Sequence, residues 1–151
     1  MKFYEARSTI QATPDVIWAI LTDAPSYASW ENGVVQVDGT IAPGETIRVV
    51  SEANPDRTFP VEVSGWRSGE SMVWSGGMPL GLFRGVRTFK LSPAPGGATA
   101  FSVREEYTGP LLGMIWRTIP DLGPSFATFA EGLKRRAEAS ATDPGTEGDR
   151  R

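Results

Sequence analysis

The chain has 151 residues, 40% of them hydrophobic and 10% aromatic, which is enough for one domain with a substantial core and too few for two typical domains. It contains no histidine and no cysteine, which excludes Ser-His and Cys-His catalysis, thiolate chemistry, disulfides and zinc fingers. With 18 acidic and 15 basic side chains the net charge is −3, so the chain as a whole has no attraction to phosphate backbones, and no nucleic-acid partner is expected.

The first elements are expected to be a strand and two short helices. Residues 3–11 combine β-forming residues and lack the apolar run of a signal peptide, so we expect a cytoplasmic protein with no membrane insertion. The Thr-Pro-Asp sequence at 13–15 predicts a helix start, with a hydroxyl cap, a proline in the first turn and a favourable carboxylate. Pro25 ends this helix near Asp23, and residues 25–30 form a second helical turn.

Short β-rich runs follow between Gly33 and Gly109, separated by glycine, proline, asparagine and aspartate. Short strands separated by such turn residues are typical of an antiparallel meander. The sequence at 54–56, Asn-Pro-Asp, is among the expected turns. Together with the first strand, the runs make seven strands; the six in this region are residues 34–41, 45–52, 59–66, 71–75, 84–91 and 99–108.

The stretch 76–83 is apolar although its glycines and proline predict a loop. Met78, Leu80 and Phe83 would carry a hydration cost unless they fold over something, and the flanking glycines permit movement. Two interpretations stay open. The loop is a lid over a pocket mouth, or it is packed on the long helix or on a second subunit.

The helical period returns after Gly109. Asp121 predicts the cap of a long carboxy-terminal helix with one apolar face, made of Leu122, Phe126, Phe129, Leu133 and Ala137. Residues 140–151 lack large apolar side chains and are expected to be a disordered tail. The sequence therefore predicts one domain over residues 1–139, of α+β class, with a curved sheet wrapped around one helix.

Several of these segments resemble a known family. They are residues 10–18 (IQATPDVIW), Leu21-Thr22-Asp23, Tyr27-Ala28-Ser29-Trp30, Pro43-Gly44 and Gly97-Ala98-Thr99. The chain is similar in them to the START-like or SRPBCC superfamily, and within it to the polyketide cyclase/dehydrase and lipid-transport group. The resemblance implies the helix-grip fold of the birch-pollen allergens: a seven-stranded antiparallel sheet around a long carboxy-terminal helix, with two short helices after the first strand. It also implies a cavity between sheet and helix that holds an apolar small molecule.

Two adjacent strands provide candidates for chemistry. Strand alternation puts Arg87 on the apolar face of residues 84–91, and Glu105 on that of residues 99–108. If Leu91 lies opposite Thr99, Arg87 is diagonal to Glu105 and within reach of it. Two interpretations stay open: a polar pair that serves a ligand, or a plain ion pair with both side chains satisfied or, after a one-residue register error, exposed.

In the functional interpretation, Arg87 polarises a ligand carbonyl or carboxylate, Glu105 acts as a base, and Tyr107 donates a hydrogen bond nearby. Trp66 is expected on the face opposite to the apolar side chains of its strand. No cofactor or metal is expected, because the chain lacks a phosphate-binding glycine motif and clustered carboxylates. The expected ligand-binding residues are Trp74, Met78, Leu80, Phe83, Phe89, Phe101, Trp116 and Phe126.

The sequence leaves three functions open. The first is binding of a hydrophobic small molecule, polyketide-like or lipid-like, in the cavity. The second, implied by the resemblance, is a cofactor-independent cyclase or dehydrase in which Arg87, Glu105 and Tyr107 promote enolisation and ring closure. The third is a protein-interaction module similar to the START-like heat-shock ATPase activators. The missing histidine counts modestly against an enzyme.

Overall fold

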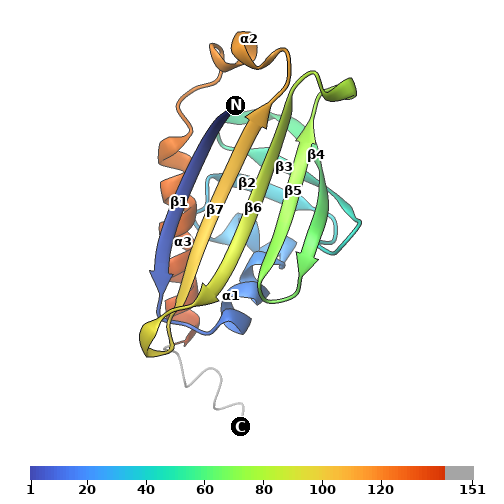
Figure 1. The fold of residues 1–151 in the computed structure, drawn as a ribbon. Helices are drawn as coiled ribbons and strands as arrows, with labels where there is room; N and C mark the ends of the chain where they lie inside the picture. Colours follow the sequence, from blue (N-terminus) through green and yellow to red (C-terminus); the bar gives the residue numbers. More distant parts are fainter. Residues whose placement is uncertain (142–151) are drawn as a thin grey trace.

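The computed structural model describes residues 1–141 (Figure 1). Seven strands form a single antiparallel sheet in the order β1-β7-β6-β5-β4-β3-β2. Their bounds are Lys2–Ile10, Val34–Asp38, Thr46–Ser51, Asn54–Arg67, Ser71–Gly77, Arg84–Pro93 and Thr99–Thr108, for β1 to β7. The α-helices are α1 (Pro14–Leu21), α2 (Leu112–Trp116) and α3 (Gly123–Ala141), and the short 3₁₀ turns are η1 (Ala24–Ser29), η2 (Pro79–Gly81) and η3 (Pro95–Gly97).

The long helix α3 lies along the inner face of the curved sheet, nearest β1 and β7, and α1 packs beside it (Figure 1). The buried side of α3 contains the expected apolar residues Phe126, Phe129, Leu133 and Ala137. The short helices after the first strand are also present. The α+β, helix-grip architecture expected from the sequence is therefore confirmed.

The residues predicted to cap the first and last helices accept hydrogen bonds from the first turns of these helices. Thr13 caps α1, accepting a hydrogen bond at its Oγ1 from the backbone N–H of Val16 at 3.4 Å. Asp121 accepts at Oδ1 from the N–H of Gly123, at the start of α3. The helix continues to Ala141, so residues 140 and 141 are helical and not part of a tail. The rest of the expected tail, 142–151, lies outside the described residues.

The expected strand 59–66 is too short, and the expected turn at 54–56 is wrong. Strand β4 begins at Asn54 and has 14 residues, so the reversal from β3 occurs at residues 52–53. A bulge then shifts the register between Ser64 and Arg67, at Gly65, whose φ of 56° suits a residue without a Cβ atom. The bulge reverses the alternation, so the indole of Trp66 turns to the core and packs edge-on against Trp18, contrary to the expectation.

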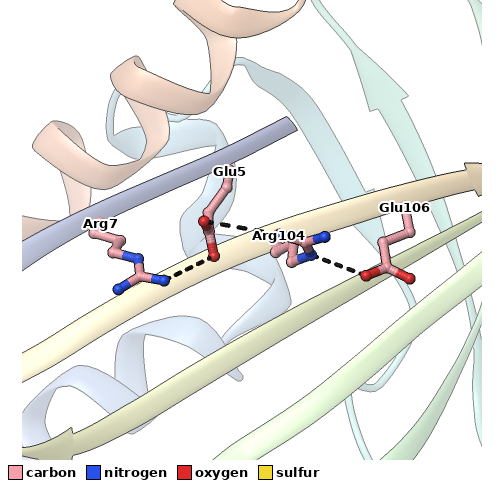
Figure 2. A network of polar contacts seen from close by, with 4 residues as sticks. All are labelled: Glu5, Arg7, Arg104 and Glu106. Carbon is pink, nitrogen blue, oxygen red and sulfur yellow. Dashed lines mark hydrogen bonds and ion pairs between the residues drawn. The ribbon is translucent and has the colours of Figure 1, made fainter. Parts of the chain in front are cut away.

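The outer face of the sheet is charged. Arg7, Glu5, Arg104 and Glu106 form one row of ion pairs across β1 and β7 (Figure 2). A hollow of about 900 Å³ lies along this face, and its lining includes these four side chains together with Lys90 from β6. Charged and polar side chains thus predominate on this part of the convex side, where Arg104 lies over the half-exposed Phe3, and most apolar side chains of the sheet face α3.

Candidate functional site

One row of side chains crosses the inner face of the sheet near its α2 end. Cross-strand pairing aligns Tyr4 on β1 with Glu105 on β7, Glu105 with Arg87 on β6, and Arg87 with Trp74 on β5. All four belong to the face that α3 covers. Antiparallel partners have Cβ atoms only about 5 Å apart, so this row brings a carboxylate, a guanidinium, an indole and a phenol together.

Arg87 and Glu105 form an ion pair, with 2.8 Å between Arg87 Nε and Glu105 Oε1. They are directly opposite each other, because Leu91 pairs with Phe101 and not with Thr99. The expected diagonal arrangement was therefore wrong by two residues. A two-residue error keeps every side chain on its face, which is why both still point inward.

Two phenylalanines of α3 cover the guanidinium of Arg87. Its Cζ atom lies 4.7 Å from the ring centroid of Phe126 and 6.0 Å from that of Phe129. The side chains of Arg87 and Glu105 are only 22% and 19% exposed. The pair thus lies between sheet and helix, where reduced contact with water strengthens its attraction for a further polar group.

The next row toward α2 has little bulk. Tyr107 pairs with Gly85, and Gly85 pairs with Gly76, so β5 and β6 carry no side chain there. A Cβ atom at Gly85 would lie 2.6 Å from Oε2 of Glu105, which shows that the carboxylate lies over this glycine. Burial, and then the negative charge of Glu105, raises the pKa of Tyr107 above its ordinary value. The Tyr107 hydroxyl therefore stays protonated at neutral pH and can donate a hydrogen bond.

Aromatic rings close the α2 end of this space. Trp116 of α2 stacks on Tyr4 at 5.5 Å between centroids and lies 5.3 Å from the ring of Tyr107. Tyr4 also stacks on Phe126 at 5.6 Å, and Phe83 stacks on Tyr107 at 6.1 Å. No residue of α2 is buried, although Trp116 is the cover of this cluster. The cover is thus held mainly by the ring contacts of one half-buried side chain, Trp116.

Deeper between sheet and helix, side chains fill the space. The ring of Phe129 lies 5.7 Å from that of Phe89 and 6.1 Å from that of Phe101, and Trp74 lies 4.9 Å from Phe89. These contacts make Phe89 and Phe101 core residues in this conformation. The expected cavity between sheet and helix is not confirmed.

The apolar loop divides into two parts. Phe83 joins the aromatic cluster, whereas Leu80 is 96% exposed and Met78 is 41% exposed. Leu80 also has a φ of 61°, a left-handed conformation that leucine rarely adopts. A backbone hydrogen bond of 3.0 Å from Leu111 N–H to the Leu82 carbonyl ties the loop to the segment before α2. In this structure Leu80 and Met78 therefore do not line the site.

Of the expected residues, the structure brings Arg87, Glu105, Tyr107, Trp74, Phe83, Trp116 and Phe126 together. Sequence reasoning missed Tyr4 and the glycine pair. Alternation in β1, where Tyr4, Ala6 and Ile10 share the inner face, was the signal for Tyr4. Within residues 1–141, acidic side chains do not gather in a group able to hold a metal ion, and no helix is long and apolar enough to cross a membrane.

Solved structures with this fold come from several bacteria, all at low identity. The Zhui aromatase/cyclase from Streptomyces sp. R1128 has a TM-score of 0.74 and 11% identity, over 95% of this chain and 98% of that one. A START superfamily protein from Mycobacterium smegmatis has a TM-score of 0.67 and 16% identity, over 91% and 98%. Protein MLL2253 from Mesorhizobium loti has a TM-score of 0.67 and 18% identity, over 94% and 99%.

These identities establish a shared fold and leave activity to the residues of each site. Among curated proteins, no sequence matches this chain. The sequence model of one family, described as polyketide cyclase / dehydrase and lipid transport, matches residues 2–138, nearly the whole described chain. The chain therefore belongs to the polyketide cyclase/dehydrase and lipid transport family, the group that its sequence resembles.

Proposed function

We propose that the protein binds an apolar small molecule, polyketide-like or lipid-like, between the sheet and α3 at the α2 end. The inward-facing pair of Arg87 and Glu105 carries this proposal. Enclosing two charges costs desolvation energy that their mutual attraction often fails to recover, so stability alone is a poor reason for the pair. A ligand with a polar end would use both groups while its apolar part contacts the surrounding rings.

The row of Gly76 and Gly85 supports the same location. With no side chain on β5 and β6 at this level, Gly85 is covered by the Glu105 carboxylate, and a flat ligand that moves this carboxylate aside can approach the β6 backbone. Access requires movement of Trp116, whose helix α2 contributes no buried residue. The ligand ring would then take the stacking position on Tyr4 that the indole occupies now.

A second candidate is a cyclase, and the neutral hydroxyl of Tyr107 beside the ion pair favours it. Arg87 would donate a hydrogen bond to a ligand carbonyl, and Glu105 would take the adjacent carbon-bound proton, giving an enolate. The enolate carbon would attack a second carbonyl and form the new carbon–carbon bond. Tyr107 would protonate the resulting alkoxide, and the proton on Glu105 would restore Tyr107. No oxidant or cofactor is needed.

Titration with fluorene, a flat aromatic hydrocarbon, tests the binding function. We expect saturable 1:1 binding by calorimetry, and at least about tenfold weaker binding by Gly85→Leu, whose side chain would displace the Glu105 carboxylate and occupy the ligand's place on β6. Gly113→Leu is the matched control, because a Cβ atom there meets nothing within 4 Å. Absence of saturable binding by the wild-type protein, together with no small molecule retained in native mass spectra, would overturn the proposal.

Product formation from a β-polyketone separates the enzyme from the carrier. An enzyme converts the compound, and Glu105→Gln abolishes conversion because the base is removed. A carrier binds the compound and returns it unchanged.

A further inference from the structure

Two enclosed indole nitrogens have no hydrogen-bond acceptor in the part of the chain that the structure describes: Nε1 of Trp30 and Nε1 of Trp74. Trp74 is 4% exposed and belongs to the row that contains Arg87. Burying a polar group without a partner is costly, so nearly all such groups in native proteins are satisfied by protein, water or ligand. These donors therefore point to an acceptor that residues 1–141 do not supply.

Both indoles border the same side chain. The ring of Tyr27 lies 5.4 Å from that of Trp30 and 5.8 Å from that of Trp74. Tyr27 is fully buried and its hydroxyl donates to the Leu21 carbonyl at 2.6 Å. The two free N–H groups thus occur in one neighbourhood, although their rings come from different elements, the end of η1 and strand β5.

The polar groups of this neighbourhood are mostly donors. Arg87 carries five N–H groups and its Nε is engaged with Glu105 Oε1. Trp74, its direct partner across β5 and β6, adds one more donor. Glu105 is the carboxylate of the row, and one of its oxygens is already used by Arg87. Because donors outnumber acceptors here, a suitable ligand must carry acceptor oxygens. A ligand with only donors, or a cation, would leave these N–H groups unpaired.

Resting on the proposed function, we infer that Trp74 determines ligand specificity by donating its indole N–H to a carbonyl oxygen of the bound molecule. The ligand class is an aromatic or alicyclic ketone or quinone, whose ring system contacts the aromatic side chains and whose oxygen lies beside Trp74 and Arg87. A site with a buried donor discriminates strongly against an analogue that lacks the acceptor, because the donor is then left unpaired.

A matched pair of compounds tests this inference: 9-fluorenone and fluorene share one ring frame and differ by a carbonyl oxygen in place of two hydrogens. The quantity to measure is the ratio of their Kd values in the wild-type protein, in Trp74→Phe and in Trp66→Phe. Solubility differences cancel, because each protein meets the same two compounds. Trp66 is the matched control, since its ring packs on Trp18 and its nitrogen is not among the unpartnered atoms.

We expect the ratio to favour fluorenone in the wild type and in Trp66→Phe, and to fall about five- to tenfold in Trp74→Phe, the size of one hydrogen bond. Retained fluorene binding by Trp74→Phe shows that the variant is folded. Equal affinity for both compounds in the wild type overturns the inference and leaves the proposed function standing. An undiminished ratio in Trp74→Phe also overturns it. Binding of neither compound overturns the inference, and it removes the proposed function as well when native mass spectra show no retained small molecule.

A spectroscopic measurement on the wild-type protein keeps the inference testable if Trp74→Phe does not fold. The five tryptophans give five indole ¹H–¹⁵N signals, and that of Trp74 is identified from phenylalanine substitutions, by elimination if necessary. Fluorenone should move the Trp74 indole proton downfield, as a new hydrogen bond requires, and fluorene should not. Saturation with fluorenone without this shift would mean that water alone satisfies the nitrogen, contrary to the inference.

Discussion

Arg87 and Glu105 meet across β6 and β7 on the inner face of the sheet, and the same hairpin carries a second pair, Arg104 and Glu106, on its outer face. Their N–O distances are 2.8 Å and 2.9 Å, so the geometry of the two contacts is nearly matched. Their surroundings differ, because the outer side chains are 33% and 44% exposed and the inner ones about half as much. The outer pair differs in two further respects, because it lies within β7 and because Arg104 also pairs with Glu5 at 3.9 Å.

The first prediction concerns these two pairs. Glu105→Gln should lower the free energy of unfolding by about 1–3 kcal/mol, because it leaves the guanidinium of Arg87 enclosed without a counter-charge. Glu106→Gln should lower it by less than about 1 kcal/mol, since Arg104 is partly solvated and keeps Glu5 as a second partner. Urea denaturation followed by circular dichroism measures both. An equal effect of the two substitutions would show that the inner pair is solvated like the outer one.

The second prediction concerns Gly132 on α3. A Cβ atom at this position would overlap the carbonyl oxygen of Glu31, so the helix can approach the segment before β2 only with glycine there. Gly132→Ala should therefore destabilise the fold by about 2–4 kcal/mol, although alanine favours helix by about 1 kcal/mol. Gly113→Ala, in the open surroundings of α2, should be neutral or stabilising. Thermal and urea unfolding of both variants decide the point, and a neutral Gly132→Ala would contradict the packing.

The third prediction is loss of stability in alkali. Burial raises the pKa of Tyr27 and of Tyr107 above the ordinary 10.0. Above pH 10 the unfolded chain therefore releases protons that the folded chain retains, and the free energy of unfolding falls as pH rises. The slope approaches about 1.4 kcal/mol per pH unit for each tyrosine.

Parallel measurements check this alkaline transition. Absorbance at 295 nm reports tyrosine ionisation and near-ultraviolet circular dichroism reports folding, and ionisation of the two tyrosines should coincide with unfolding. Tyr107→Phe should reduce the slope between pH 10 and 12, whereas Phe83→Leu, a change at its stacking partner, should keep it. Ionisation of both buried tyrosines in the folded protein would contradict the prediction.

The fourth prediction concerns which of two segments, α2 or residues 78–81, closes over a bound ligand. In the free protein, the backbone amide hydrogens of α2 should exchange rapidly with solvent, because no side chain of α2 is buried. Fluorene should slow them once Trp116 or the ligand closes the end. Amides of residues 78–81 should change little, because Leu80 makes no cover in this structure. Ligand-induced protection at 78–81 and none in α2 would assign the lid to the loop.

The sequence predicted the face of each strand better than the pairing between strands. Alternation put Arg87, Glu105 and Tyr107 on the inner face, where the structure has them. It did not determine the register, because the glycines and prolines at 93–97 allow hairpins of several lengths. The turn at 94–98 is shorter than expected; with Ala94 N–H bonded to the Ala98 carbonyl, it places Pro93 and not Leu91 opposite Thr99.

Irregular backbone and non-local contacts account for the features that the sequence did not predict. One bulge at Gly65 reversed the expected side of Trp66, since a local change of φ has no counterpart in a binary pattern of polar and apolar residues. The aromatic cluster at Tyr4 joins residues from β1, β7, α2 and α3, and such non-local contacts depend on how the elements dock. Composition predicted many large rings, but it could not separate a filled interior from a hollow one.

The position of the first residues has a practical consequence for handling the protein. Lys2 lies over the indole of Trp116, 5.9 Å from the ring centroid, so the start of β1 borders α2. The carboxyl end of α3 is at the opposite end of the molecule (Figure 1). An affinity tag fused before Met1 would crowd the ring cover and compete with added compounds, whereas a tag fused after residue 151 attaches to the chain beyond α3. Screening libraries against this protein should therefore use the carboxy-terminal tag.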